Sequence, residues 1–141
     1  LKKYLLMGYK IEDVEGIGPV YGEKLRAVGI SAVDKLLELG ATKSGRSSLA
    51  KETGISEKEI LKWVNHADLF RIAGVGSQFA ELLEAAGVDT VKELRNRNAE
   101  NLYSKIGEVN EEKKLVRRLP SLSQVEEMIE LAGTLDPKVT H

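Results

Sequence analysis

The sequence contains no cysteine and only two histidines, His66 and His141, among its 141 residues. Without cysteine, disulfide bonds, thiolate zinc sites and cysteine nucleophiles are excluded together. Two histidines, one of them the last residue, also exclude a metal site built from several imidazoles of one chain. No apolar run approaches the roughly 18 residues that cross a bilayer, and Leu1–Tyr9 is too short for a signal peptide. We therefore expect a cytoplasmic protein that does not associate with membranes.

The sequence also lacks an excess of either basic or acidic residues, because 21 basic and 22 acidic side chains give a net charge of −1. Residues 1–67 carry a small excess of basic side chains, and residues 68–141 carry a small excess of acidic ones. The strongly basic balance that marks many nucleic-acid-binding domains is therefore absent. Any contact with nucleic acid must come from local geometry and a small patch.

The sequence repeats itself, which indicates an internal duplication. The segment Val14–Leu25 aligns with Ile72–Leu83, and apolar and glycine positions stay in register beyond it. Apolar residues recur at spacings of three and four, and no stretch alternates with a period of two. We predict an all-α protein of two tandem units, Ile11–Ala67 and Asp68–Thr134, with about five short helices in each. The expected N-caps are Ser31, Ser56, Thr90, Asn98, Asn110 and Ser123, the last of them in a capping box.

Each unit begins with two glycines separated by one apolar residue, in Gly16–Gly18 and Gly74–Gly76. A chain reversal this short requires positive φ or close backbone approach, both of which glycine permits. The intervening Ile17 or Val75 can enter the core and fix the turn. The turn also leaves unpaired N–H groups at a helix N-terminus, where a phosphate can bind.

Both turns fit the pattern h-x-G-h-G-x-x-x-A/G-x-x-L and resemble the helix-hairpin-helix motif. This resemblance implies binding to the DNA sugar-phosphate backbone without sequence readout, which in some members of the family is accompanied by a monovalent cation on the carbonyls of the hairpin, here the first turn. From Val14 to Ile60 the chain also resembles the N-terminal domain of RecA-family recombinases of archaea and eukaryotes. Over residues 10–134 it is similar to domain-of-unknown-function family 4332, with the match carried by Phe70–Gly76, Leu82–Val91 and Glu111–Pro120.

The candidate nucleic-acid-binding residues come from the first turn and the helix after it. Main-chain N–H groups would hold a phosphate, and two basic side chains would add positive charge. The second turn is a poorer candidate, since Glu81 and Glu84 follow it and no base lies between Ala73 and Gly87; we expect it to pack against the first unit or a protein partner. The candidate residues of the first turn and its helix are Gly16, Ile17, Gly18, Gly22, Lys24 and Arg26.

A second basic patch consists of Lys113, Lys114, Arg117 and Arg118. On a helix, residues 113 and 117 share one side, and so do 114 and 118, which would make a surface that follows phosphates. Glu111 and Glu112 precede the patch, so the alternative is that these charges only complement a helix macrodipole. For Trp63, base stacking is conceivable, but packing in the core is the preferred interpretation.

Nothing in the sequence supports catalysis. The segment Gly40–Ser47 approaches a P-loop but has Arg46 in place of the lysine and follows a helical pattern rather than a strand. His66 has no nucleophile beside it in the sequence. We expect a non-enzymatic module without metal or cofactor that binds duplex DNA weakly and without sequence preference. The alternative is a protein-interaction or scaffold module that keeps this fold without binding nucleic acid.

Overall fold

The computed structural model describes residues 9–141, which form an all-α fold, as predicted. In the described part of the chain the only β pairing is an isolated bridge between Lys10 and Ala32. The elements are η1 (Ile11–Asp13, a 3₁₀ turn), α2 (Pro19–Ala27), α3 (Val33–Gly40), α4 (Lys43–Thr53), α5 (Glu57–Leu69), α6 (Ser77–Ala85), α7 (Val91–Arg95), α8 (Ala99–Lys113) and α9 (Leu122–Thr134).

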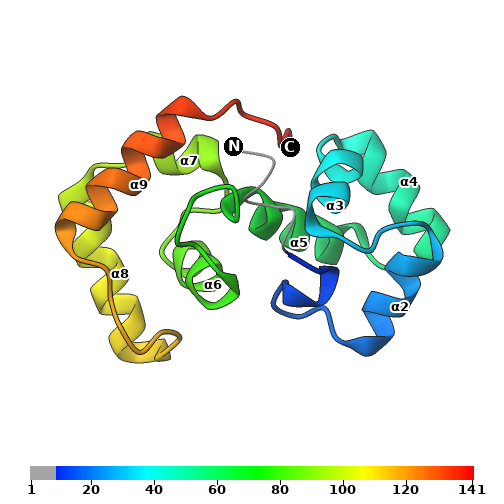
Figure 1. The fold of residues 1–141 in the computed structure, drawn as a ribbon, viewed down its shortest axis with the longest axis horizontal. Coiled ribbons are helices and arrows are strands. Elements are labelled where there is room, and N and C mark those ends of the chain that lie inside the picture. The colour runs from blue at the N-terminus through cyan, green and yellow to red at the C-terminus, as the bar shows by residue number, and fades with distance from the viewer. Residues whose placement is uncertain (1–8) are drawn as a thin grey trace.

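Helix α5 lies at the centre of the molecule (Figure 1). Helices α2, α3 and α4 lie on one side of it, and α6 to α9 lie on the other. The side chain of its N-cap, Ser56, accepts a hydrogen bond from the N–H of Glu59, and the buried residues of α5 include Trp63 and Val64. The helix runs without a break to Leu69, through the position predicted to separate the two units.

The backbone of the two halves agrees closely. Gly16 and Gly74 have φ of +93° and +91°. Helices α2 and α6 have nine residues each, while α5 and α9 have thirteen each, with a serine N-cap. Helix α5 packs on α3 and α4, as α9 packs on α7 and α8. These values agree with the predicted duplication, although the second half has no separate helical turn like η1, because α5 and a short turn lead directly to Gly74.

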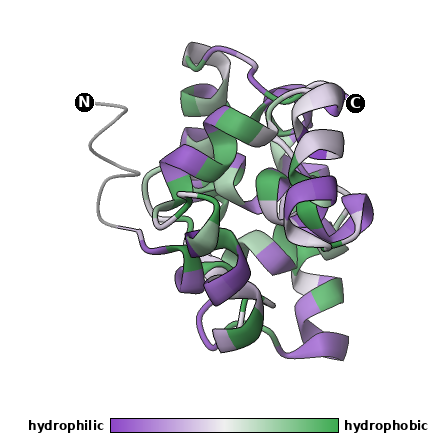
Figure 2. Ribbon diagram, turned by 90° about the vertical axis from the view of Figure 1, so that its right-hand side faces the viewer, coloured by the Kyte–Doolittle hydropathy of each residue, from purple (hydrophilic) through white to green (hydrophobic). Residues whose placement is uncertain are grey.

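The predicted helix starts are partly correct. Ser56, Thr90 and Asn98 are N-caps whose side chains accept a backbone N–H. The prediction at Ser123 is wrong, because the capping box is formed by Ser121 with Gln124 two residues earlier. The predictions at Asn110 and Ser31 are also wrong, because Asn110 lies within α8 and the N-cap of α3 is Ala32. Hydropathy is mixed along the ribbon of most helices, as expected for elements with one face on the core (Figure 2).

A buried ion pair joins the end of α5 to the second half. Asp68 is 1% exposed and Arg71 is 4% exposed. Nη1 of Arg71 donates to Oδ1 of Asp68 at 2.9 Å, and the N–H of Val91 donates to the other carboxylate oxygen at 2.8 Å. Asp68 therefore caps the start of α7 and neutralises a buried guanidinium.

The C-terminal tail returns from α9 to the first half of the chain (Figure 1). Buried Arg46 donates to the carbonyl oxygens of Gly40, Ala41 and Thr140, and the N–H of Thr140 donates to the carbonyl of Ala41 at 2.9 Å. Burial lowers the pKa of Arg46. The P-loop-like segment is thus the corner between α3 and α4, and its arginine fastens the tail.

Candidate nucleic-acid interface

The first glycine turn lies on the surface, between η1 and α2. Gly16 and Gly18 are exposed, while Ile17 between them is 4% exposed and enters the core, as predicted. Gly16 has positive φ, and a Cβ at this position would lie 3.3 Å from Nε1 of Trp63. Both its backbone conformation and the indole beneath it therefore require glycine. Gly18 is the N-cap of α2, and Pro19 is the first residue of the helix.

Several main-chain N–H groups at this turn have no hydrogen-bond partner among residues 9–141, and those of Gly18, Val20 and Tyr21 lie at the start of α2. They lie at the N-terminus of a nine-residue helix, where the helix dipole is positive. Exposed donors of this kind at a helix start can bind an anion such as a phosphate. The N–H groups of Ile17 and Gly22 are already used, because they donate to the carbonyls of Val14 and Gly18 at 3.1 and 2.8 Å.

Gly22 lets a carboxylate pack against α2. It is buried, and a Cβ at this position would lie 2.6 Å from Oε2 of Glu12. Because its N–H is bonded to the carbonyl of Gly18, this group is not free for the phosphate contact that the sequence predicts. The same holds for Ile17, whose side chain is in the core and whose N–H is bonded to Val14.

Arg26 is not a free cation. Its Nε and Nη2 donate to Oε2 and Oε1 of Glu12 at 3.0 and 2.6 Å. These hydrogen bonds lower the pKa of the Glu12 carboxyl and raise that of the Arg26 guanidinium. The prediction that Arg26 adds charge for a phosphate did not include Glu12, which lies 14 residues earlier and carries no sequence signal for this pairing.

Lys24 is the free cation of the first unit's turn and helix. It is exposed and forms no ion pair within the part of the chain that the structure describes. At the equivalent position of the second unit stands Leu82, which is fully buried.

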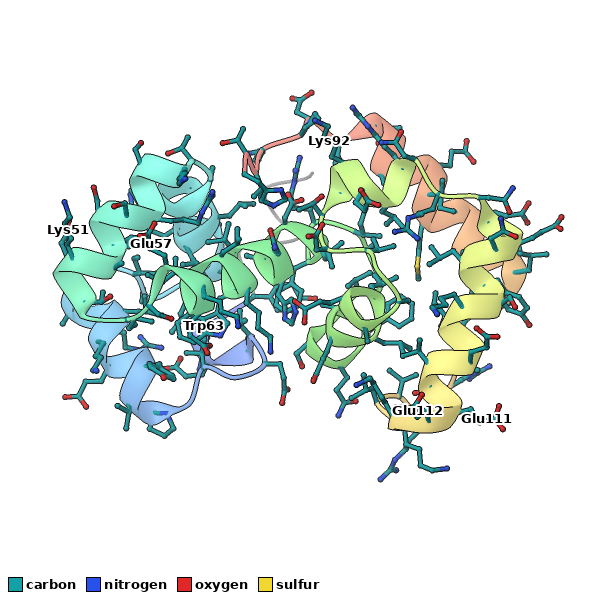
Figure 3. The ribbon with its side chains drawn as sticks, turned by 180° about the vertical axis from the view of Figure 1, so that it is seen from behind. Lys51, Glu57, Trp63, Lys92, Glu111 and Glu112 are labelled. Carbon is teal, nitrogen blue, oxygen red and sulfur yellow. The ribbon has the colours of Figure 1, made fainter. Side chains whose placement is uncertain are left out.

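Trp63 supports this turn from below and is fully buried, so the preferred core interpretation is confirmed. Its ring centroid lies 5.0 Å from that of Tyr21. Figure 3 shows Trp63 on the side of α5 that faces η1 and α2.

The sequence matches the family described as a domain of unknown function (DUF4332) over residues 15–135. The chain belongs to this family. No curated protein and no solved structure matches the chain. The family assignment thus covers both glycine turns of this DUF4332 protein, and the description of the family states no activity.

The second turn of this DUF4332 chain has the same backbone as the first but different charges. The helix that follows it, α6, carries Glu81 and Glu84 and no base. Oε2 of Glu84 lies 3.3 Å from Nε2 of fully buried His66. This contact with the imidazole, more than any other cause, lowers the pKa of Glu84. An anionic helix after the turn makes it unsuited to phosphate.

The second basic patch lies on a loop, so the predicted helical arrangement is wrong. Helix α8 ends at Lys113, Lys114 is a left-handed C-cap with φ of +52°, and Arg117 and Arg118 follow in the loop before α9. The Asn110 side chain holds this loop with two hydrogen bonds of 3.0 Å to the backbone of Val116. All four basic side chains are exposed, and none forms an ion pair within residues 9–141. The patch belongs to the second unit and lies far from the first turn (Figure 1).

The described residues contain no group of three or more His, Asp or Glu placed to hold a metal ion. None of the helices in residues 9–141 is long and apolar enough to span a membrane.

Proposed function

We propose that this DUF4332 protein is a non-enzymatic module that binds the DNA backbone without reading sequence, through the first glycine turn. The observation that carries the proposal is the exposed start of α2, where the N–H groups of Gly18, Val20 and Tyr21 have no partner among the described residues. Lys24 lies on the same helix with a free ammonium group. Main-chain donors and one lysine recognise a phosphate and carry no information about base identity.

The small charge of this site sets the expected strength of binding. Each neutralised phosphate adds about 0.9 to the slope of log K against log salt. A site with one free lysine, next to a neutralised Arg26, therefore gives weak binding with a shallow salt dependence. Two adjacent acids, Glu15 and Glu23, are exposed and weaken the attraction further.

Lys24→Ala is expected to weaken binding to a labelled DNA duplex by up to about tenfold at roughly 50 mM salt and to lower the salt slope by about one. Fluorescence anisotropy at two salt concentrations, on duplex and single-stranded DNA, measures both quantities. Lys92→Ala is the matched control, since Lys92 is also an exposed helix lysine but lies far from Trp63 and from the turn that packs on it (Figure 3). Absence of wild-type binding at the lower salt concentration, or an equal loss in both variants, would refute the proposal.

Glu12→Gln is expected to tighten DNA binding about twofold or more and to raise the salt slope by about one. The amide cannot neutralise the guanidinium, so Arg26 becomes a second free cation on α2. The same titration measures the change, and the double variant Glu12→Gln with Arg26→Ala is the control that should remove the gain. A gain that persists in the double variant would show that Arg26 does not reach the DNA.

A further inference from the structure

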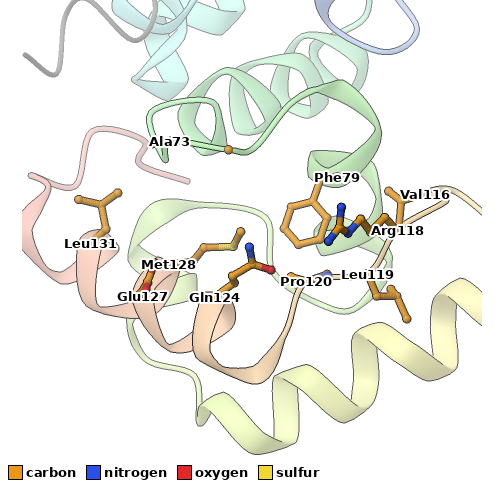
Figure 4. A pocket seen from close by; sticks show the side chains of 11 residues that line it. Ala73, Phe79, Val116, Arg118, Leu119, Pro120, Gln124, Glu127, Met128 and Leu131 are labelled. Carbon is orange, nitrogen blue, oxygen red and sulfur yellow. The ribbon is translucent and has the colours of Figure 1, made fainter.

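The second unit contains a groove of about 580 Å³. It lies between the second glycine turn, the loop after α8 and helix α9 (Figure 4). Its lining mixes apolar side chains, among them Phe79, Val116 and Met128, with the polar side chains of Arg118, Gln124 and Glu127.

The two units explain why the groove is there. Met128 stands seven residues after the serine N-cap of α9, and Trp63 stands seven residues after the serine N-cap of α5. Phe79 is the third residue of α6, as Tyr21 is the third residue of α2. In the first unit the indole of Trp63 fills the space beside Gly16 and Tyr21. In the second unit the smaller, half-buried Met128 leaves the corresponding space beside Gly74 and Phe79 as the groove.

One rim of the groove carries Arg118 of the second basic patch, close to Phe79 in Figure 4. Lys114 and Arg117 are on the same loop as Arg118, and Lys113 is the last residue of α8. None of these four side chains is paired with an acid within the described chain. Glu127 is the one acidic residue in the lining. The free charges therefore favour an acidic occupant.

We propose that this groove binds a bulky aromatic side chain presented by an acidic segment of a protein partner. The first unit shows the size of group that the site accommodates, since its own tryptophan occupies the equivalent place. The flexible Met128 and the aromatic Phe79 are suited to contact such a ring. Residues 1–8 of this chain contain Lys2 and Lys3 and no acid, so the basic rim disfavours them as the occupant. Nucleic acid is disfavoured by the apolar side chains in the lining, which offer a phosphate no hydrogen-bond donor.

The experiment uses the full chain, labelled with ¹⁵N, and the acetylated and amidated pentapeptide Asp-Glu-Trp-Glu-Asp as the probe. On addition of the peptide, we expect the amide chemical shifts of the protein to change at Phe79, Val116 and Met128, and not at Gly16 or Gly18. The variant Met128→Trp fills the groove as Trp63 does in the first unit, so it should weaken peptide binding at least about tenfold and leave DNA binding unchanged. The double variant Arg117→Glu with Arg118→Glu changes only exposed side chains and should weaken peptide binding to a similar extent.

Several results would overturn the proposal. One is that a peptide with alanine in place of tryptophan, or a peptide with lysines in place of the acids, binds as tightly as the original peptide. Another is unchanged binding of the peptide to the variant Met128→Trp.

Other results would identify a different occupant. Shifts of the groove residues that follow protein concentration without peptide would identify a second copy as the occupant, and contacts from residues 1–8 would identify the chain itself. Larger shifts with a DNA duplex than with the peptide would assign the groove to nucleic acid. Because the first turn is not involved, failure here leaves the proposed DNA binding intact, and the reverse also holds.

Discussion

Asp68→Ala is expected to lower the free energy of unfolding by about 3–5 kcal/mol. The substitution leaves the Arg71 guanidinium, which is 4% exposed, without its carboxylate. It also removes the acceptor of the Val91 N–H at the start of α7. A buried charge that loses its partner costs far more than a surface ion pair contributes. Urea unfolding followed by circular dichroism measures the change.

Two further variants separate the buried charge from other effects of the substitution. Asp136→Ala removes an exposed aspartate and should change stability by less than about 0.5 kcal/mol. Asp68→Ala combined with Arg71→Met removes both charges and should recover part of the loss. A loss below about 1 kcal/mol for Asp68→Ala alone would show that Arg71 finds solvent or another acceptor.

Trp63→Ala is expected to cost about 3–5 kcal/mol, because it removes the largest fully buried side chain. Its effect extends to function, since the indole lies beneath Gly16 and against Tyr21. Without this support the first turn is no longer held in one conformation, and DNA binding should fall by several fold. Urea unfolding and DNA anisotropy on the same preparation measure the two effects.

Trp63→Met is the matched control, because methionine stands at the corresponding position of the second unit. It should cost less stability than alanine and should open a groove in the first unit. If Trp63→Ala loses stability and keeps full DNA affinity, the turn does not depend on the indole for its conformation.

The sequence predicts the fold well because its signals are local. Apolar spacing and side-chain caps act within a few residues, as at Ser56 and Asn98. The geometry of the first turn follows from the two glycines, and Ile17 is buried as the pattern requires.

The charges of the site are less predictable, because they depend on which side chains meet in space. Glu12 neutralises Arg26 from 14 residues away, and nothing in the sequence indicates this pairing. The basic patch was expected on a helix, but Asn110 bonds to Val116 and holds the patch as a loop. The groove follows from one substitution between the repeats, Trp63 to Met128, which becomes informative only once both helices are seen in equivalent places.

The uninterrupted α5 and the tail held by Arg46 give the molecule two separate ties between its halves. A hinge motion between the halves would have to bend α5 or break the hydrogen bond from Arg46 to Thr140. A protein seated in the groove would then be presented to a bound duplex in a single orientation. The chain would then limit the relative orientation of its two proposed ligands, the DNA duplex and the protein partner.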